Sequence, residues 1–268
     1  MTQDAIHRSA HAPKRSGDET FAAPYLAPFS RIGVAVGLGL STLILLVVFN
    51  RFPGIDLTVA GWFFTELPCR DGDQRDVCGG FLAMTDPNLM MVRELLHYLP
   101  VSIAIALLIA AIAAGFSDKA RLRLFARGAM TAVAAILISS LLIVNLILKE
   151  FVGRPRPVHT DLFAGELPFV EAGRFTDYCA SNCSFVSGEA STGFWLVCLV
   201  PLFPAWLRPF AWVITLSLAA ITSGLRIAFG GHYLSDVVLG AGITLTVFSV
   251  LAVLARSRRA YDVWPGGS

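Results

Sequence analysis

Three short polar clusters in the second half of the chain contain the residue types that phosphate chemistry needs. They lie at 149–157, 182–191 and 226–236. Lysine and arginine provide fixed positive charge, and the guanidinium offers paired N–H donors that match a phosphate dianion. The candidate phosphate-binding cations are Lys149, Arg156 and Arg226.

The middle cluster reads "NCSFVSGEAS" and stands at the entrance of a long apolar stretch. Ser187 and Gly188 precede the start of a predicted helix, where free N–H groups and the helix dipole favour an anion. Glycine also permits close approach of the backbone to a ligand. We therefore add Ser187 and Gly188 to the candidate phosphate-binding residues.

The last cluster contains a histidine and an aspartate four residues apart. His232 and Asp236 lie on one face if a helix begins there. A carboxylate on one ring nitrogen fixes the tautomer and leaves the other nitrogen free to attack phosphorus. The three clusters together predict phosphoryl transfer through a phosphohistidine.

These clusters stand at the ends of uncharged stretches long enough to cross about 30 Å of hydrocarbon. The 268 residues are 55% hydrophobic and only 15% charged, which is typical of an integral membrane protein. We predict an all-α membrane protein, a six-transmembrane-helix bundle. The expected spans are Ile32–Phe49, Leu99–Phe116, Gly128–Leu148, Ala190–Leu207, Pro209–Leu225 and Val237–Ala255.

The distribution of charge predicts the orientation. With the N-terminus in the cytoplasm, the inside segments hold 12 of the 21 basic residues but only five of the 19 acidic ones. Both termini are then cytoplasmic, in the inner (plasma) membrane of a bacterium, and the active site lies at the periplasmic face. We expect a disordered cytoplasmic tail at 1–30, a membrane domain at 31–256 whose first span is an uncleaved anchor, and a cytoplasmic tail at 257–268.

Four of the five cysteines fall in the predicted outside loops. Cys69 and Cys78 lie in the first loop, and Cys179 and Cys183 in the second. Thiols in an oxidising compartment suggest two disulfides. Their pairing stays open, within or between loops, and free thiols or a structural zinc are the alternatives.

The segment Asn88–Tyr98 mixes apolar and charged residues at helical spacing just before the second span. One interpretation is an amphipathic helix that lies in the membrane interface. The other is an early, water-exposed start of the second span.

The spacing of the clusters resembles that of the type 2 phosphatidic acid phosphatase superfamily. Its pattern is Lys, six residues, Arg-Pro; then Pro-Ser-Gly-His; then Ser-Arg, five residues, His, three residues, Asp. Lys149 to Arg156-Pro157 matches the first motif. The third motif matches in spacing, although Leu225 replaces its serine, and the second reads Val186-Ser187-Gly188-Glu189.

The resemblance implies a metal-independent lipid phosphatase without a cofactor. His232 would be the nucleophile and Asp236 its partner. Glu189 occupies the place of the histidine that protonates the leaving oxygen. Either Glu189 is the catalytic acid, which requires a protonated carboxyl, or it pairs with a phosphate-binding arginine while another group donates the proton.

A phosphate site at the level of the headgroups predicts a phosphorylated membrane lipid as substrate and the bilayer as surroundings, with no nucleic-acid partner. The sequence "CSFVSGEAS" and the second outside loop resemble those of bacterial phosphatases that act on lipid A. Undecaprenyl diphosphate, phosphatidylglycerophosphate and transfer of the phosphate to a second lipid remain open. A non-catalytic binder or transporter of anionic lipids is the alternative of another class.

Overall fold

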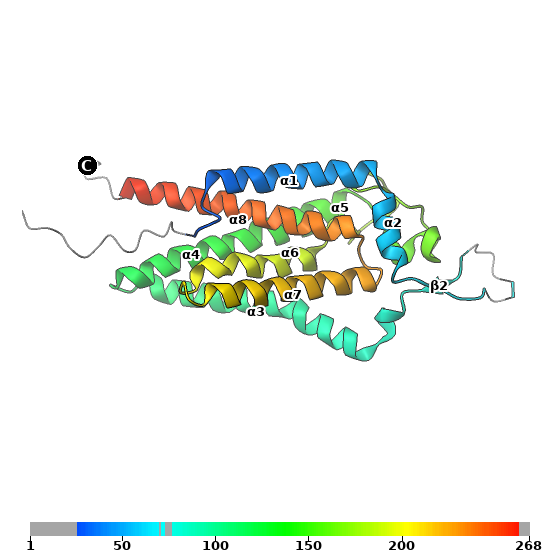
Figure 1. The fold of residues 1–268 in the computed structure, drawn as a ribbon, viewed down its shortest axis with the longest axis horizontal. Helices are drawn as coiled ribbons and strands as arrows, with labels where there is room; N and C mark the ends of the chain where they lie inside the picture. The colour runs from blue at the N-terminus through cyan, green and yellow to red at the C-terminus, as the bar shows by residue number, and fades with distance from the viewer. Residues whose placement is uncertain (1–25, 70, 73–76, 263–268) are drawn as a thin grey trace, which may run out of the picture.

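The computed structural model describes residues 26–69, 71–72 and 77–262, and most of them form one bundle of helices (Figure 1). Long apolar segments in lipid must satisfy their own backbone hydrogen bonds, which is why they form helices. The principal helices are α1 (Ile32–Arg51), α3 (Pro87–Gly115), α4 (Ala120–Ile136), α6 (Gly188–Trp195), α7 (Arg208–Ala228) and α8 (Leu234–Asp262).

Five helical segments of the described chain are long and apolar enough to cross a membrane, so the protein is a multi-pass membrane protein. They are Ile32–Arg51, Pro87–Gly115, Ala120–Phe151, Arg208–Ala228 and Leu234–Arg256. The remaining expected span, Ala190–Leu207, is an apolar helix that covers only Gly188–Leu202. Its second half is the 3₁₀ helix η6 (Leu196–Leu202), which contains Pro201, and Pro204 follows. Prolines cannot donate a backbone hydrogen bond, which accounts for the early end of this helix.

The segment after α4 continues as a π-helix, η3 (Leu137–Leu148), and then as α5 (Lys149–Phe151). Within it, the Asn145 side chain donates to the carbonyl of Ser140 over 2.6 Å. Wide turns of this kind occur often at functional sites, because they rotate the residues that follow. Here the π-helix carries Lys149 to the end of the bundle.

Helix α3 is continuous from Pro87 to Gly115, so Asn88–Tyr98 is the early start of the second span. Asp86 caps its N-terminus by accepting hydrogen bonds from the amides of Asn88 and Leu89. Figure 1 shows the first turns of α3 diverging from the bundle.

The core of the bundle surrounds α6. Trp195 is fully buried, and its indole N–H donates to the carbonyl of Ala132 over 2.7 Å. The same cluster includes Leu26 and Phe29, both 4% exposed. Residues 26–30, which the sequence assigned to a disordered tail, therefore pack against the bundle, because Phe29 stacks on Trp212 of α7 and meets Phe248 of α8 edge to face. Residues 1–25 lie outside the described chain, and α8 continues past the expected boundary at 256 to Asp262.

The loops gather at the end of the bundle opposite the start of α1 and the end of α8 (Figure 1). They contain α2 (Gly54–Gly61), the antiparallel strands β1 (Thr65–Glu66) and β2 (Gly79–Gly80), and the 3₁₀ helices η2 (Leu82–Thr85), η4 (Pro157–His159) and η5 (Asp161–Phe163). Disulfides join Cys69 to Cys78 and Cys179 to Cys183, which confirms the two predicted bridges and pairs each within its own loop.

Candidate active site

A polar pocket of about 330 Å³ brings the three sequence motifs together. Its lining combines residues of all three motifs with residues of α3. The motif residues in it are Lys149, Arg156, Gly188, Glu189, Arg226 and His232. A larger cavity of about 1080 Å³, lined mainly by apolar residues of α3, α4 and α8, contains none of them, so the smaller pocket is the candidate active site.

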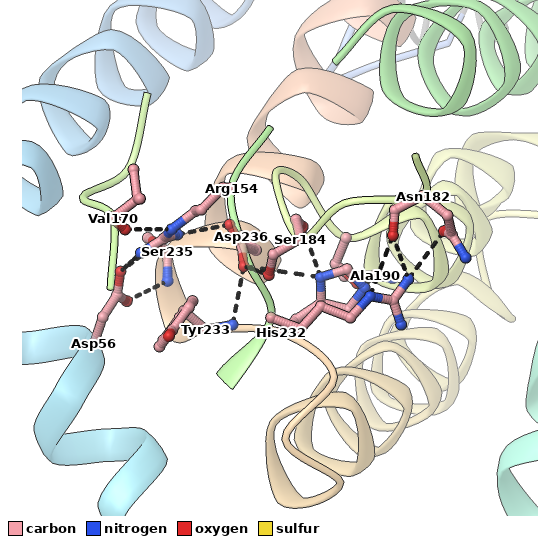
Figure 2. Close-up of polar contacts among 12 residues, drawn as sticks. Asp56, Arg154, Val170, Asn182, Ser184, Ala190, His232, Tyr233, Ser235 and Asp236 are labelled. Carbon is pink, nitrogen blue, oxygen red and sulfur yellow. Dashed lines mark hydrogen bonds and ion pairs between the residues drawn. The ribbon is translucent and has the colours of Figure 1, made fainter. Parts of the chain in front are cut away.

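His232 lies in the loop between α7 and α8 and is only 1% exposed. Its Nδ1 is 2.7 Å from the carbonyl oxygen of Ser184 (Figure 2). A carbonyl can only accept, so Nδ1 carries the proton and Nε2 has a free lone pair. Burial lowers the pKa of His232 to about 4, although the charge of Asp236 opposes part of the shift. The ring is therefore neutral at neutral pH, as a nucleophile must be.

Asp236 holds the surroundings of His232 rather than its ring. One carboxylate oxygen accepts from the Ser184 hydroxyl at 2.5 Å and from the Tyr233 amide at 2.9 Å. The same oxygen is 3.8 Å from His232 Nδ1, too far for a hydrogen bond. The predicted pairing of His232 with Asp236 is thus indirect, because Ser184 accepts the proton of His232 through its carbonyl and donates to Asp236 through its hydroxyl.

Arg154 is a central residue that the sequence motifs did not identify. It is completely buried, donates to Asp236 over 2.7 Å and to Asp56 over 2.8 Å, and lies 4.2 Å from the centre of the Tyr233 ring (Figure 2). These neighbouring carboxylates raise the pKa of Arg154 against the effect of burial. Its place between Lys149 and Arg156 in the first motif was the available signal.

Asp56 on α2 completes this buried network. Its carboxylate accepts from the Ser235 amide at 2.8 Å and from the Ser235 hydroxyl at 2.5 Å. Burial raises the pKa of Asp56, and Arg154 opposes that shift. The position of Asp56 within the apolar run Gly54–Gly61 was a sequence signal for this network. An aspartate that is buried with apolar residues is almost always paired with a cation.

Arg226 presents its guanidinium to the pocket with few partners. It is 6% exposed, and its Nε has no hydrogen-bond partner among the described residues. The nearest carboxylate oxygen belongs to Glu189, 3.5 Å from Nη1. A side chain at Gly231 would lie 2.6 Å from Nη2, so the glycine allows the loop to pass directly over the guanidinium. Unpaired N–H groups of this kind can donate hydrogen bonds to a bound phosphate.

The first two motifs meet at Gly188. A Cβ atom there would lie 2.8 Å from the side-chain oxygen of Asn145 and 3.4 Å from Lys149 Nζ. The absence of a side chain therefore lets Lys149 approach the start of α6. Lys149 and the N-terminus of α6 then offer positive charge from two directions to one position.

Arg156 is held in place by the loop between α5 and α6. Its Nη2 donates to the backbone carbonyl and to the side-chain oxygen of Asn182, both over 2.9 Å (Figure 2). Burial lowers the pKa of Arg156, and nearby carboxylates oppose the shift. Asn182 lies between Cys179 and Cys183, so the disulfide closes the short turn that holds Arg156.

Ser187 does not line the pocket. It is fully buried, its hydroxyl accepts from the Ala190 amide at 3.3 Å, and its own amide donates to the carbonyl of Asp236. Ser187 therefore caps α6 and fixes the second motif against the third. Of the second motif, Gly188 and Glu189 line the pocket and Ser187 does not.

Glu189 forms the centre of an ionic cluster. Arg93 of α3 donates to it through two guanidinium nitrogens, from Nη2 to Oε1 over 2.5 Å and from Nε to Oε2 over 3.3 Å. His97 Nδ1 is 3.8 Å from the same Oε1. These contacts correspond to the second sequence interpretation, in which Glu189 pairs with an arginine. Arg93 and His97 belong to none of the motifs, and their signal was a pair of polar residues four apart in Asn88–Tyr98.

Comparison with known proteins gives this arrangement a family. Residues 128–260 match the PAP2 superfamily. The chain is 41% identical over 217 residues to the lipid A 4′-phosphatase of Rhizobium etli, a match that covers 80% of this chain and 84% of the relative. It is 39% identical to the protein of the same name from Rhizobium leguminosarum, over 80% of this chain and 93% of the relative. Identity to the Francisella tularensis subsp. novicida lipid A 4′-phosphatase is 30%, over 79% and 91%.

A solved structure has the same fold. It is the transmembrane PAP2-type phosphatidylglycerolphosphate phosphatase of Bacillus subtilis, with a TM-score of 0.52 and 18% identity, covering 87% of this chain and 99% of the other. The relatives at 30% identity or more are matched over most of their length. The chain therefore belongs to the PAP2 superfamily and is a membrane-bound phosphoric monoester hydrolase.

Proposed function

We propose that this protein removes the 4′-phosphate of lipid A through a phosphohistidine at His232. One observation carries the mechanism. The Nδ1 of His232 donates to a carbonyl, so its Nε2 is the unprotonated atom in a pocket lined by several cations. That arrangement suits attack on the phosphorus of a bound phosphate monoester.

The reaction has two steps. In the first, Nε2 of His232 forms a bond to phosphorus while the bond from phosphorus to the sugar oxygen breaks. Lys149, Arg156 and Arg226 stabilise the charge on the non-bridging oxygens in the transition state. In the second step, water attacks phosphorus, the N–P bond breaks, and inorganic phosphate leaves.

Asp236 has a positioning role in this proposal. It fixes Ser184, whose carbonyl orients the ring, and its negative charge stabilises the positive charge that develops on His232. Arg154 and Asp56 in turn hold Asp236. Glu189 takes the second of its two expected roles, as the ionised partner that positions Arg93 and Arg226.

The substrate follows from the relatives. Three lipid A 4′-phosphatases match about four fifths of the chain each. Undecaprenyl diphosphate and phosphatidylglycerophosphate remain the competing substrates for the same pocket. The lipid A 4′-phosphate is favoured because these relatives are 30% to 41% identical to the chain.

We further propose that Gly188–Leu202 is the sixth crossing and that the pocket faces the periplasm, with both termini in the cytoplasm. The excess of basic residues at the end of the bundle opposite the pocket supports this orientation. The disulfides at the pocket end also support it, because they form in an oxidising compartment. A bacterial inner membrane satisfies both conditions.

The test is release of phosphate by the purified protein in lipid nanodiscs. Lipid A carrying the label on its 4′-phosphate should be hydrolysed, whereas lipid A labelled on its other phosphate, a polyprenyl diphosphate and phosphatidylglycerophosphate should release little. His232→Gln should abolish both phosphate release and labelling of the protein. His159→Gln is the matched control, because His159 is an exposed loop histidine that does not line the pocket.

Three results would contradict the proposal. Preference for another lipid would reassign the substrate. Full activity of His232→Gln would remove the phosphohistidine, and binding of lipid A without hydrolysis by the wild type would indicate a binding protein.

A further inference from the structure

Helix α3 contributes a pair of polar residues to the pocket that none of the three motifs contains. Arg93 and His97 are one helical turn apart, so they lie on the same face of α3. Both line the pocket that also contains His232. Both contact the same carboxylate, that of Glu189. The pocket therefore contains two polar residues of α3 in addition to the motif cations and the nucleophile.

The contacts of Glu189 make it an acceptor rather than a proton donor. Arg93 donates to both of its oxygens, and Arg226 is within 3.5 Å of Oε1. Bidentate pairing of a carboxylate with two nitrogens of one guanidinium is a strong charge-assisted interaction of the ionised form. A phosphate that binds Arg226 would leave the Arg93 pair in place. The sugar oxygen that leaves phosphorus still needs a proton from another group.

His97 has the chemistry and the location to supply that proton. Its Nδ1 is 3.8 Å from Glu189 Oε1, so Nε2, on the other side of the ring, faces away from that carboxylate. Its side chain is about half exposed, at 46%, which leaves it accessible to a bound substrate. The Tyr98 ring packs against it at 5.0 Å between centroids. Histidine is the side chain that gains and loses a proton near neutral pH.

We propose that His97 is the general acid of this enzyme, a role that rests on the phosphohistidine mechanism proposed above. In the first step, Nε2 of protonated His97 gives its proton to the sugar oxygen as the P–O bond breaks and the N–P bond to His232 forms. In the second step, neutral His97 takes a proton from the attacking water as the N–P bond breaks. The products are the dephosphorylated lipid and inorganic phosphate, and both histidines return to their starting states.

The charges around His97 come from several elements. Arg93 lies on its own helix, Glu189 on α6 and Arg226 on α7. Lys149 and Arg156 line the same pocket from the segment after η3. Glu189 is the carboxylate among these charged residues, and in this proposal it holds Arg93 and Arg226 in place.

The test compares two substrates whose leaving groups differ in their need for a proton. The rate of phosphoenzyme formation is measured in a single turnover, with lipid A and with 4-nitrophenyl phosphate, whose phenolate leaves unprotonated. His97→Gln should slow formation from lipid A by about 100-fold or more, as expected for loss of a general acid. Formation from 4-nitrophenyl phosphate should change little. His159→Gln should change neither rate.

Glu189→Gln separates this proposal from the one in which Glu189 is the acid. The variant should slow phosphoenzyme formation from both substrates alike, because it disturbs Arg93 and Arg226 rather than proton transfer. A loss confined to lipid A in Glu189→Gln, with none in His97→Gln, would overturn the role of His97. Equal losses for both substrates in His97→Gln would also overturn it and make His97 a structural residue.

If His97→Gln does not fold, a pH profile of the wild type distinguishes a general acid from a structural residue at position 97. A requirement for protonated His97 predicts a fall in the rate on the alkaline side for lipid A but not for 4-nitrophenyl phosphate. The same fall for both substrates would contradict the proposal. Failure of the phosphohistidine mechanism is distinct, because the wild type would then form no labelled histidine from either substrate.

Discussion

Two clusters of arginine and carboxylate side chains lie side by side at one end of this bundle, and they are built on opposite principles. In the buried cluster, Arg154 donates to two carboxylates, a hydroxyl and a backbone carbonyl. In the pocket, the lining combines four cationic side chains with the single carboxylate of Glu189. The buried cluster pairs its one cation with two carboxylates, whereas the pocket has more cations than carboxylates.

What distinguishes the scaffold from the binding site is whether a buried arginine has hydrogen-bond partners within the protein, and not the residue type. Arg154 and Arg226 are both almost completely buried. Every nitrogen of Arg154 has a partner, but Arg226 has an unpartnered Nε among the described residues. A buried donor without a partner is costly. Such a group is therefore expected where a ligand completes its hydrogen bonds.

The largest effect is expected from removing the scaffold cation. Arg154→Met leaves Asp56 and Asp236 buried without their shared partner, which should lower the free energy of unfolding by about 3–5 kcal/mol. Arg174→Met is the matched control, because Arg174 is an exposed partner of Glu171 and should contribute less than about 1 kcal/mol. Unfolding of both variants in the same detergent tests this. Equal stability of the two would mean that the buried cluster is not a scaffold.

The pH dependence of stability tests the protonation state of His232. Its pKa is about 6.5 when unfolded and about 4 when buried in the fold. The unfolded chain therefore takes up the proton first. The contribution of neutral His232 is complete above pH 6.5 and is lost as the pH falls toward 4.

For one group with this shift, the loss approaches about 3 kcal/mol. His232→Gln removes the titrating group, so its free energy of unfolding should fall less steeply between pH 6.5 and 4 than that of the wild type. Only the slopes are compared, because the substitution also changes the absolute stability. Parallel curves would show that His232 is not held neutral by the fold.

Removing a pocket cation should lower activity much more than stability, whereas removing Arg154 should mainly lower stability. Arg226→Gln should lower kcat/KM by about 100-fold, or about 2.7 kcal/mol of transition-state stabilisation. Its free energy of unfolding should change by less than about 1 kcal/mol, because Arg226 makes one ionic contact within the described part of the chain, at 3.5 Å. Loss of stability comparable to that of Arg154→Met would erase the distinction between the two clusters.

The sequence predicted the pocket better than it predicted the scaffold. Lys149, Arg156, Arg226 and His232 were identified because motif spacing fixes them at the ends of helices, and helix ends meet at one face of a bundle. The carboxylate network was missed because it joins Asp56 to Arg154 across 98 positions of sequence. No local pattern encodes such a contact.

The structural roles of individual residues also could not be predicted from the local sequence. Ser187 caps α6 instead of facing the pocket, since the N-cap position and the approach of α8 decide where its hydroxyl points. The interface or span ambiguity of Asn88–Tyr98 could not be resolved from composition, because Arg93 and His97 are polar residues whose partner lies on another helix. Prediction succeeded where geometry is local and failed where a distant partner decides.

The smallest effect is expected from the disulfide beside the pocket. The Cys179–Cys183 bridge closes the turn that carries Asn182, and Asn182 positions only one of the four cations, Arg156. Cys179→Ser with Cys183→Ser should therefore lower kcat/KM by about threefold to tenfold, near 1 kcal/mol, through looser positioning of Arg156. Hydrolysis of lipid A by the oxidised wild type and the double variant measures this loss.

The other bridge supplies the control, and Asn182 supplies the test of cause. Cys69→Ser with Cys78→Ser changes two residues of which neither lines the pocket, so kcat/KM should stay within about twofold. Asn182→Ala should reduce kcat/KM about as much as the Cys179 and Cys183 substitutions. Combining all three should add little, because the bridge and the amide act through the same guanidinium. Fully additive losses would show that the disulfide supports the pocket by a route other than Arg156, and the turn would then belong with the scaffold rather than with the binding site.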